Sequence, residues 1–426
     1  MKRGFYTIMS AQFCSSLADN ALFVAAVELL RTNGSPEWQR AALVPMFALF
    51  YVVLAPFVGA FADAMPKGKV MFVSNAIKVV GCLMMLFGSH PLIAYAVVGL
   101  GAAAYSPAKY GILTELLPAS QLVKANGWIE GLTIASIILG VLLGGQLVGP
   151  NISHWLLSVD VPLLDTGIDT AAEAAIATLI AVYLAAAWFN TRIPHTGVEM
   201  RAMPGNPLAL LPDFWSCNNR LWRDKLGQIS LATTTLFWGA GGNLKFIVLA
   251  WAAAALSYNT TQASALTGVV AIGTAVGAVV ASMRMRLDMA TKVIPLGIAM
   301  GVLLILMVFI KSIWIAIPFL ILLGGLGGYL VVPMNALLQH RGHNLMGAGR
   351  SIAVQNFNEQ AAILGLGAFY SLSLKMGLSV FGAITVFGLV VAGVMWLIRR
   401  WHISNCTRYS EEVEHLLHIA RHDHHH

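Results

Sequence analysis

The sequence predicts an all-α polytopic membrane protein with twelve transmembrane helices arranged as two six-helix bundles. The first observation behind this class is composition: 58% of the 426 residues are hydrophobic, only 11% are charged, and the mean hydropathy is +0.75. Ordinary soluble domains do not have such a composition. The second observation is a succession of apolar runs long enough to cross a bilayer. The third is the return of their polar landmarks in the second half of the chain.

Twelve apolar runs follow one another, each near the roughly 20 residues that a membrane helix needs. They lie at about residues 7–30, 41–62, 69–89, 91–114, 124–149, 171–192, 227–256, 263–283, 292–310, 313–338, 350–374 and 378–399. The first run lacks a small-residue cleavage pattern, so we expect a membrane helix and not a signal peptide. The expected parts are an N-terminal bundle over 1–192, a proline-containing cytoplasmic linker over 193–226, a C-terminal bundle over 227–400 and a cytoplasmic tail over 401–426.

The polar landmarks of the first half recur in the second half at a nearly constant offset. The matched pairs are Pro107 with Pro333, Asn126 with Gln355, Glu130 with Glu359, and Asp63 with Asp288. Chance similarity between apolar helices would rarely maintain such an offset. A parallel duplication indicates two like-oriented bundles with a site between them, which is a transporter architecture.

The distribution of Lys and Arg predicts the orientation in the membrane. If both termini are cytoplasmic, nineteen of these residues fall on inner connections and tails and four on outer connections. Cytoplasmic loops carry the excess of basic residues, so this orientation is the expected one. The pI near 9.3 then reflects membrane topology, and no nucleic-acid partner is expected.

Neither cysteines nor histidines predict a metal or cofactor site. The four cysteines, Cys14, Cys82, Cys217 and Cys406, are scattered without ligand or disulfide spacing. In the tail, His415, His418 and His422 share a helical face, but an ordinary surface helix is the favoured interpretation. That helix is expected to lie on the inner leaflet through an apolar face of Val413, Leu416, Leu417 and Ala420.

Six ionisable residues lie within the apolar runs: Asp19, Lys78, Lys109, Glu130, Lys245 and Glu359. Each unpaired charge near a helix centre costs roughly 2.5–3.5 kcal/mol on the insertion scale. The six side chains must therefore face protein, water or one another. Three are acids and three are bases, which suits pairing.

We expect different roles for these charges according to their position along the runs. Lys78 is expected to be structural and to extend to the inner surface. The pair Asp19 and Asn20, together with Lys109 and Lys245, is expected to line a central cavity. Asp19 and Lys245 should lie at similar depth in opposite halves, where they are predicted to form an ion pair.

Two amide and acid pairs are spaced four residues apart and so share a helical face: Asn126 with Glu130, and Gln355 with Glu359. Such faces either form permanent hydrogen bonds between helices or form a gate whose weak bonds break and reform. We expect the gate, with Asp63 in the neighbouring inner connection.

Several strings carry a family resemblance. They are Gln12 with 18–22, 55–59 with 62–63, 101–113, 122–127, 237–241, 332–333 with 335–339, and 353–356. With these strings the chain resembles the major facilitator superfamily and, within it, the lysophospholipid transporter family, over nearly its whole length. It departs from the family at Ala64, where a basic residue is usual, and at Lys245, where arginine is usual. The basic cluster of the inner connection is displaced to Lys67-Gly68-Lys69.

The resemblance implies a secondary transporter and not an enzyme. It implies movement of lysophospholipids, such as lysophosphatidylethanolamine and lysophosphatidylglycerol, across a bacterial inner membrane to the cytoplasmic leaflet by alternating access. A lysophospholipid acyltransferase would restore the second chain there. The family fold also implies a monomer whose cavity is lined by the first, fourth, seventh and tenth spans, which carry Asp19, Lys109, Lys245 and Asn335. Glu130 and Glu359 fall on spans at the interface of the halves.

Head-group chemistry suits these residues, since Lys109 and Lys245 are candidates for the phosphate and Asp19 or Glu130 for an ammonium. The main alternative is a proton-coupled exporter of drugs or other amphiphiles, because Asp19, Glu130 or Glu359 can bind a proton once desolvated. A lipid-modifying enzyme is disfavoured, because the apolar runs contain no nucleophile motif and no acid cluster with metal-ligand spacing.

Replacing Lys109 tests the phosphate assignment. Lys109→Ala should lower lysophospholipid uptake at least about tenfold, because a charge-assisted hydrogen bond is worth roughly 1.5–3 kcal/mol. Uptake per inserted molecule is the measurement, with Lys311→Ala in an expected outer connection as the control. Wild-type uptake by a normally inserted Lys109→Ala protein would remove this lysine from the site.

Overall fold

The computed structural model describes residues 3–116, 119–159, 168–197, 200, 202–203, 205–346 and 348–422. Every regular element in these residues is a helix, which confirms the predicted all-α class. The chain divides into two compact units. Unit 1 comprises Met1–Pro207 with Ser257–Gly268, and unit 2 comprises Leu208–Leu256 with Val269–His426.

The helices of unit 1 follow the predicted apolar runs. They are α1 (Arg3–Thr32), α2 (Glu37–Val53), α3 (Ala55–Asp63), α4 (Lys67–Leu86), α5 (Pro91–Leu116), α6 (Ala119–Leu147), α7 (Pro150–Ser158) and α8 (Ala171–Thr191). The start of α11 (Thr260–Arg284) also belongs to this unit. Arg31 Nη1 donates to Thr260 Oγ1 at 3.1 Å, the same hydroxyl bonds Glu28, and Thr261 Oγ1 donates to the Gly145 carbonyl at 2.6 Å.

The helices of unit 2 follow the runs of the second half. They are α9 (Leu210–Arg223) after the short turn η1 (Pro207–Ala209), α10 (Gly227–Leu256), the remainder of α11, η2 (Leu287–Val293), α12 (Ile294–Met307), α13 (Ile313–Met346), α14 (Ala348–Lys375), α15 (Val380–Arg408) and α16 (Ser410–His422).

The run 41–62, predicted as a single span, is bent, because the chain turns by 65° between α2 and α3. The chain also turns by 64° between α6 and α7, where α7 begins just after the end of the predicted run 124–149. Each second helix begins with a proline, Pro56 or Pro150, at its first or second position. Proline is favoured there and cannot continue a preceding helix, because it lacks an N–H and its ring clashes with the previous turn.

In the described residues, nine helices are long and apolar enough to cross a membrane, or eleven spans if each bent pair counts as one. Twelve spans were predicted. The helix α14 occupies the eleventh predicted run and is not among the nine. Its first half carries Arg350 and five amide or acidic residues, Gln355, Asn356, Asn358, Glu359 and Gln360, which lower its apolarity.

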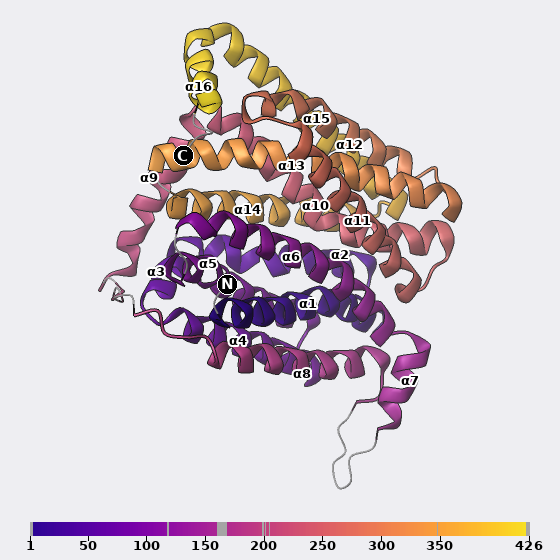
Figure 1. Ribbon diagram of the computed structural model, residues 1–426. Coiled ribbons are helices and arrows are strands. Elements are labelled where there is room, and N and C mark those ends of the chain that lie inside the picture. Colours follow the sequence, from indigo (N-terminus) through magenta and orange to yellow (C-terminus); the bar gives the residue numbers. More distant parts are fainter. Residues whose placement is uncertain are drawn as a thin grey trace. The chain divides into compact units, whose positions relative to one another are not determined.

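The helix α1 is the centre of unit 1. It packs against α6 and α8, and α4 packs against α5 and α8, so that α1, α4 and α8 lie alongside one another (Figure 1). The approach of α6 depends on Gly144, because a Cβ there would lie 2.7 Å from the Ala21 carbonyl oxygen. Close packing through small residues is the usual way in which membrane helices associate.

Unit 2 is built on the pairs α12 with α15, α10 with α14 and α10 with α13. In its part of α11, Gly277 faces the backbone of Gly325 on α13, where any Cβ would overlap the carbonyl. The same principle of backbone contact through glycine therefore operates in both units.

The predicted linker contains a helix that sequence interpretation missed. In α9, Phe214, Cys217, Asn218 and Leu221 are buried, and the helix packs on α10, α13 and α14. Buried residues at positions i, i+3, i+4 and i+7 mark an amphipathic helix. The prolines of this segment obscured the pattern, although Pro212 sits in the first turn of α9, where proline is tolerated.

The tail forms the predicted amphipathic helix, α16, but its apolar face packs on the protein. Val413, Leu416 and Ala420 are buried, and the contacts of α16 are with η2 and α15. Arg421 Nε on α16 donates to Asp288 Oδ2 of η2 at 3.0 Å. In Figure 1, α16 folds back beside the end of α15.

A buried ion pair joins α13 to the start of α10. Arg341 donates two hydrogen bonds to the Asp224 carboxylate, from Nε to Oδ2 at 2.9 Å and from Nη2 to Oδ1 at 2.7 Å. Both side chains are less than a tenth exposed. Asp224 Oδ2 also accepts the N–H of Gly227 in the first turn of α10 at 2.8 Å. This carboxylate therefore fixes the connection between α9 and α10.

Removing one partner of this pair should be costly. Arg341→Met should lower the free energy of unfolding by about 3–5 kcal/mol, because Asp224 stays buried without a counter-charge, and adding Asp224→Asn should recover part of the loss. Arg350→Met is the control, since its 3.7 Å pair with Asp213 is mostly exposed and should be worth at most about 1 kcal/mol. Unfolding in detergent is the measurement, and equal losses for both variants would contradict the argument.

Candidate functional site

Polar residues of α1 face three neighbouring helices. On one side Gln12 and Ser16 face α6, where Gln12 Nε2 donates to Thr133 Oγ1 at 3.0 Å and the Ser16 and Ser136 hydroxyls lie 2.7 Å apart. On another side, Ser15 and Asp19 meet α4 and α8. Because residues four apart share a helical face, the α1 sequence directs these two polar pairs to different partners.

Asp19 is held through both carboxylate oxygens. Lys78 Nζ on α4 lies 2.9 Å from Oδ2, and the Tyr183 hydroxyl on α8 donates to Oδ1 at 2.6 Å. The ammonium also donates to Ser15 Oγ at 2.8 Å, and Ser15 Oγ in turn donates to Asn75 Oδ1 at 2.7 Å. Together these five residues form the Asp19 network, which joins three helices of unit 1.

Aromatic rings enclose the cation of the Asp19 network. Lys78 Nζ lies 5.2 Å from the ring centroid of Tyr105 and 5.7 Å from that of Tyr183, within the range in which a cation is attracted to the ring face. The Lys78 side chain is 2% exposed, whereas that of Asp19 is 20% exposed. The carboxylate is therefore the member of the pair that an incoming ligand can reach.

The structure corrects one sequence-based expectation. Lys78 was expected to extend to the inner surface, and this is wrong, since its ammonium is buried and bonded to Asp19 and Ser15. Within unit 1, Lys78 is the ion-pair partner of Asp19, and the predicted pair of Asp19 with Lys245 of the other unit stays a prediction.

The remaining predicted cavity residues are distributed as follows. Asn20 donates from Nδ2 to the Ser16 carbonyl at 2.8 Å and is tied to its own helix. Lys109 lies on α5 two residues after Pro107 and is half-buried, and Lys245 lies half-buried on α10. Near Lys245, the Asn243 amide donates to the Ile363 carbonyl on α14 at 3.2 Å, which links α10 to α14.

In unit 2 the predicted amide and acid face exists. Gln355 Nε2 donates to Glu359 Oε1 at 2.9 Å and also bonds Asn335 Oδ1 on α13. Gln355 and Glu359 are less than a tenth exposed. These three residues therefore form one polar cluster. Asn335 was predicted to line the cavity, whereas Gln355 and Glu359 were predicted to belong to a gate. The side chains of Asp63, Asn126 and Glu130 lie outside the described residues.

Sequence interpretation missed Tyr183, Ser15 and Asn75 as members of the Asp19 network, and Tyr105 as the ring beside Lys78. One signal was present for Tyr183, which is the only tyrosine in the apolar run 171–192 and carries a hydroxyl that needs a partner when buried. Among the described residues there is no group of three His, Cys, Asp or Glu side chains that could hold a metal ion.

The sequence of this chain matches a known family and known relatives. The model of the Major Facilitator Superfamily matches residues 8–365. A protein named lysophospholipid transporter LplT from Yersinia enterocolitica serotype O:8 / biotype 1B is 40% identical over 381 residues, covering 89% of each chain. A protein of the same name from Yersinia pestis (strain Pestoides F) is 40% identical over 378 residues, covering 88% of each chain.

Solved structures share the fold at low identity. A bacterial homologue of the human lysosomal transporter Spinster matches with a TM-score of 0.62 at 16% identity, covering 99% of this chain and 98% of that one. The nucleoside transporter NupG matches with a TM-score of 0.67 at 12% identity, covering 95% of this chain and 99% of that one. These likenesses confirm the fold and carry no conclusion about substrate.

The Asp19 and Lys78 pair predicts an energetic coupling. In a double-mutant cycle, the effects of Asp19→Asn and Lys78→Met on the free energy of unfolding should couple by about 0.5–3 kcal/mol. Either substitution alone leaves the other residue of the pair without its partner. The same cycle with Asp19→Asn and Lys245→Met is the control and should be additive to within about 0.5 kcal/mol. Coupling in the control and additivity in the first cycle would reverse the assignment of the pair.

Proposed function

We propose that this chain, which belongs to the major facilitator superfamily, is a secondary transporter of lysophospholipids such as lysophosphatidylethanolamine and lysophosphatidylglycerol. The observation that carries the proposal is its 40% identity, over 89% of its length, to a protein named lysophospholipid transporter LplT. Similarity that extends along both units supports a shared activity better than a local motif would.

The chemistry of the Asp19 network is compatible with such a head group. An ethanolamine ammonium or a glycerol hydroxyl offers donors for the exposed edge of the Asp19 carboxylate. Lys109 and Lys245 remain our candidates for the phosphate. Either lysine would bind the phosphate as a point charge, without the bidentate geometry of arginine.

We further propose that transport proceeds by alternating access, in which differential binding shifts the population between states. The cluster of Asn335, Gln355 and Glu359 serves as part of the gate, with Asn126, Glu130 and Asp63 as its proposed counterparts. Amide hydrogen bonds between membrane helices average only about 0.6 kcal/mol, so such contacts can break and reform during a cycle.

The membrane and partners follow from the same proposal. The excess of Lys and Arg on predicted inner connections supports two cytoplasmic termini in a bacterial inner membrane. Lysophospholipid delivered to the cytoplasmic leaflet is the substrate of a lysophospholipid acyltransferase, which makes that enzyme the functional partner. We propose that the transporter works as a monomer and without a cofactor.

Reconstitution tests the function. Purified protein in liposomes should move lysophosphatidylethanolamine between leaflets, and Asp19→Ala should slow this at least about tenfold through loss of a charge-assisted contact. Asp288→Ala is the control, because that carboxylate bonds Arg421 far along the chain from the network. A wild-type protein that moves no lysophospholipid, but exports an amphiphilic dye when a proton gradient is imposed, would support the proton-coupled alternative instead.

A further inference from the structure

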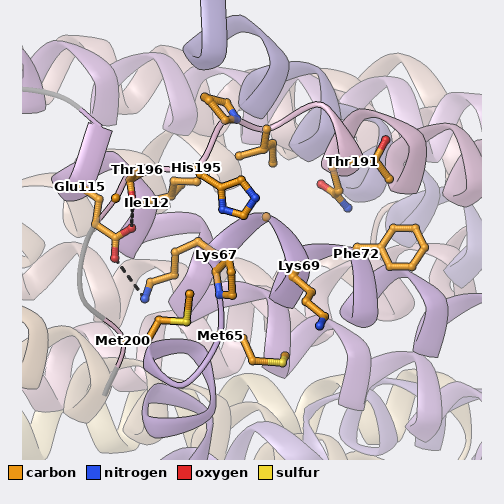
Figure 2. A pocket seen from close by; sticks show the side chains of 16 residues that line it. Met65, Lys67, Lys69, Phe72, Ile112, Glu115, Thr191, His195, Thr196 and Met200 are labelled. Atoms are coloured by element: carbon orange, nitrogen blue, oxygen red, sulfur yellow. Dashed lines mark hydrogen bonds and ion pairs between the residues drawn. The ribbon is translucent and has the colours of Figure 1, made fainter. Parts of the chain in front are cut away.

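A cavity with several polar lining residues lies in unit 1, built from residues outside the Asp19 network. It has a volume of about 400 Å³ and lies where the start of α4, the end of α5, the end of α8 and the segment 193–197 meet. Lys67, Lys69, Asn190, Thr191 and His195 are among its polar lining residues (Figure 2). The distribution of basic residues predicts that this end of the unit faces the cytoplasm.

The start of α4 gives the cavity an unusual concentration of positive charge. The first turn of α4 contains Lys67, Gly68 and Lys69 and no acidic residue, and Pro66 provides no side-chain cap. The first N–H groups of any helix lack partners inside the helix, and this end carries the positive pole of the helix dipole. Basic residues there are unfavourable unless an anion compensates them, and such a start is a ready site for a phosphate.

One of the two lysines already has a counter-charge. Lys67 Nζ lies 3.2 Å from Glu115 Oε1 and donates to the Ala62 carbonyl at 3.0 Å, while Glu115 Oε2 accepts from Thr196 Oγ1 at 2.8 Å. Lys69 is exposed and forms no ion pair with any side chain that the structure describes. Among the described residues that line the cavity, Lys69 and the exposed His195 are the basic side chains that a ligand can reach.

Asn190 supplies an independent indication of a ligand. It lines the cavity, is 2% exposed, and neither its side-chain nitrogen nor its side-chain oxygen bonds any described group. Its backbone is adjacent to the start of α4, since a Cβ on Gly68 would lie 3.3 Å from the Asn190 carbonyl oxygen. A buried polar group without a hydrogen-bond partner costs about 1–3 kcal/mol. We therefore expect a ligand to offer an acceptor to the side-chain nitrogen of Asn190 and a donor to its side-chain oxygen.

These features together define the ligand. We propose that the cavity binds a phosphate ester that carries a neighbouring hydroxyl or ammonium group, as in the head group of a glycerophospholipid. The phosphate accepts from the start of α4, Lys69 and Asn190 Nδ2, and the neighbouring group donates to Asn190 Oδ1. Met65, Phe72 and Met200 also line the cavity, and the large exposure of Phe72 and Met200 offers an apolar edge for the glycerol backbone.

Thermal unfolding of the full-length protein in a neutral detergent tests the site. Dihexanoyl phosphatidylglycerol, whose glycerol hydroxyls can donate, should raise the Tm of the wild type, and dihexanoyl phosphatidylcholine, whose head group has no donor, should raise it less. In Asn190→Leu and Lys69→Gln the apparent affinity for phosphatidylglycerol should fall at least about tenfold, as expected for one charge-assisted bond. Lys292→Gln, an exposed lysine of η2, is the matched control and should behave as wild type.

Two soluble probes separate the sources of the ligand. Stabilisation by glycerol 3-phosphate equal to that by the lipid, and lost in both variants, would support the site and assign it to a soluble phosphate ester. Equal stabilisation by inorganic phosphate would overturn the role of the hydroxyl or ammonium donor. Unchanged lipid stabilisation in Lys69→Gln, a surface variant that should fold normally, would overturn the site even if Asn190→Leu failed to fold.

The test of this site is independent of the test of the proposed transport function. Lys69→Gln should retain lysophosphatidylethanolamine transport in phosphatidylcholine liposomes, and Asp19→Ala should retain stabilisation by phosphatidylglycerol while losing transport. Loss of phosphatidylglycerol stabilisation in Asp19→Ala, with retention in Lys69→Gln, would place the lipid in the transport site and overturn the second site.

Discussion

The ion pair between Asp19 and Lys78 is the interaction on which unit 1 depends. Either charge alone would be expensive in an apolar bundle, and together, with Tyr183 and Ser15, they satisfy one another in a network across α1, α4 and α8. The network constrains the rotation of three helices, because a turn of α1 or α4 would separate the two charges and a turn of α8 would remove the Tyr183 hydroxyl from Asp19. Small residues such as Gly144 then allow α6 to approach the remaining face of α1.

The helices could be predicted from the sequence because apolar runs are a local property. The bend within the run 41–62 has a cause in the sequence, Pro56, yet the apolar pattern of a run is the same whether its helix is straight or kinked. The helix α9 was missed because prolines were given more weight than the periodic burial of Phe214, Cys217 and Leu221. For α16 the apolar face was evident, but whether a membrane or the protein covers such a face depends on tertiary structure.

The contacts of the candidate site also include some that the sequence predicts and some that depend on tertiary structure. The bond between Gln355 and Glu359 was predictable, since residues four apart on a helix always share a face. The bond between Lys78 and Asp19 was not, because 59 residues separate them and the sequence does not state how α4 is rotated against α1. Depth along the helix made Lys245 an equally good partner for Asp19. Only the lateral arrangement of the helices distinguishes the two lysines.

The asymmetry within the Asp19 network has a consequence for binding. Lys78 is enclosed by tyrosine rings and is almost fully buried, whereas the side chain of Asp19 is one-fifth exposed. In the proposed site, a cationic ligand would approach Asp19 without first displacing Lys78, and the Lys78 ammonium would compensate the carboxylate once the ligand had left. Such an arrangement would leave no unpaired buried charge in either the empty or the occupied form, which is the condition that repeated binding and release require.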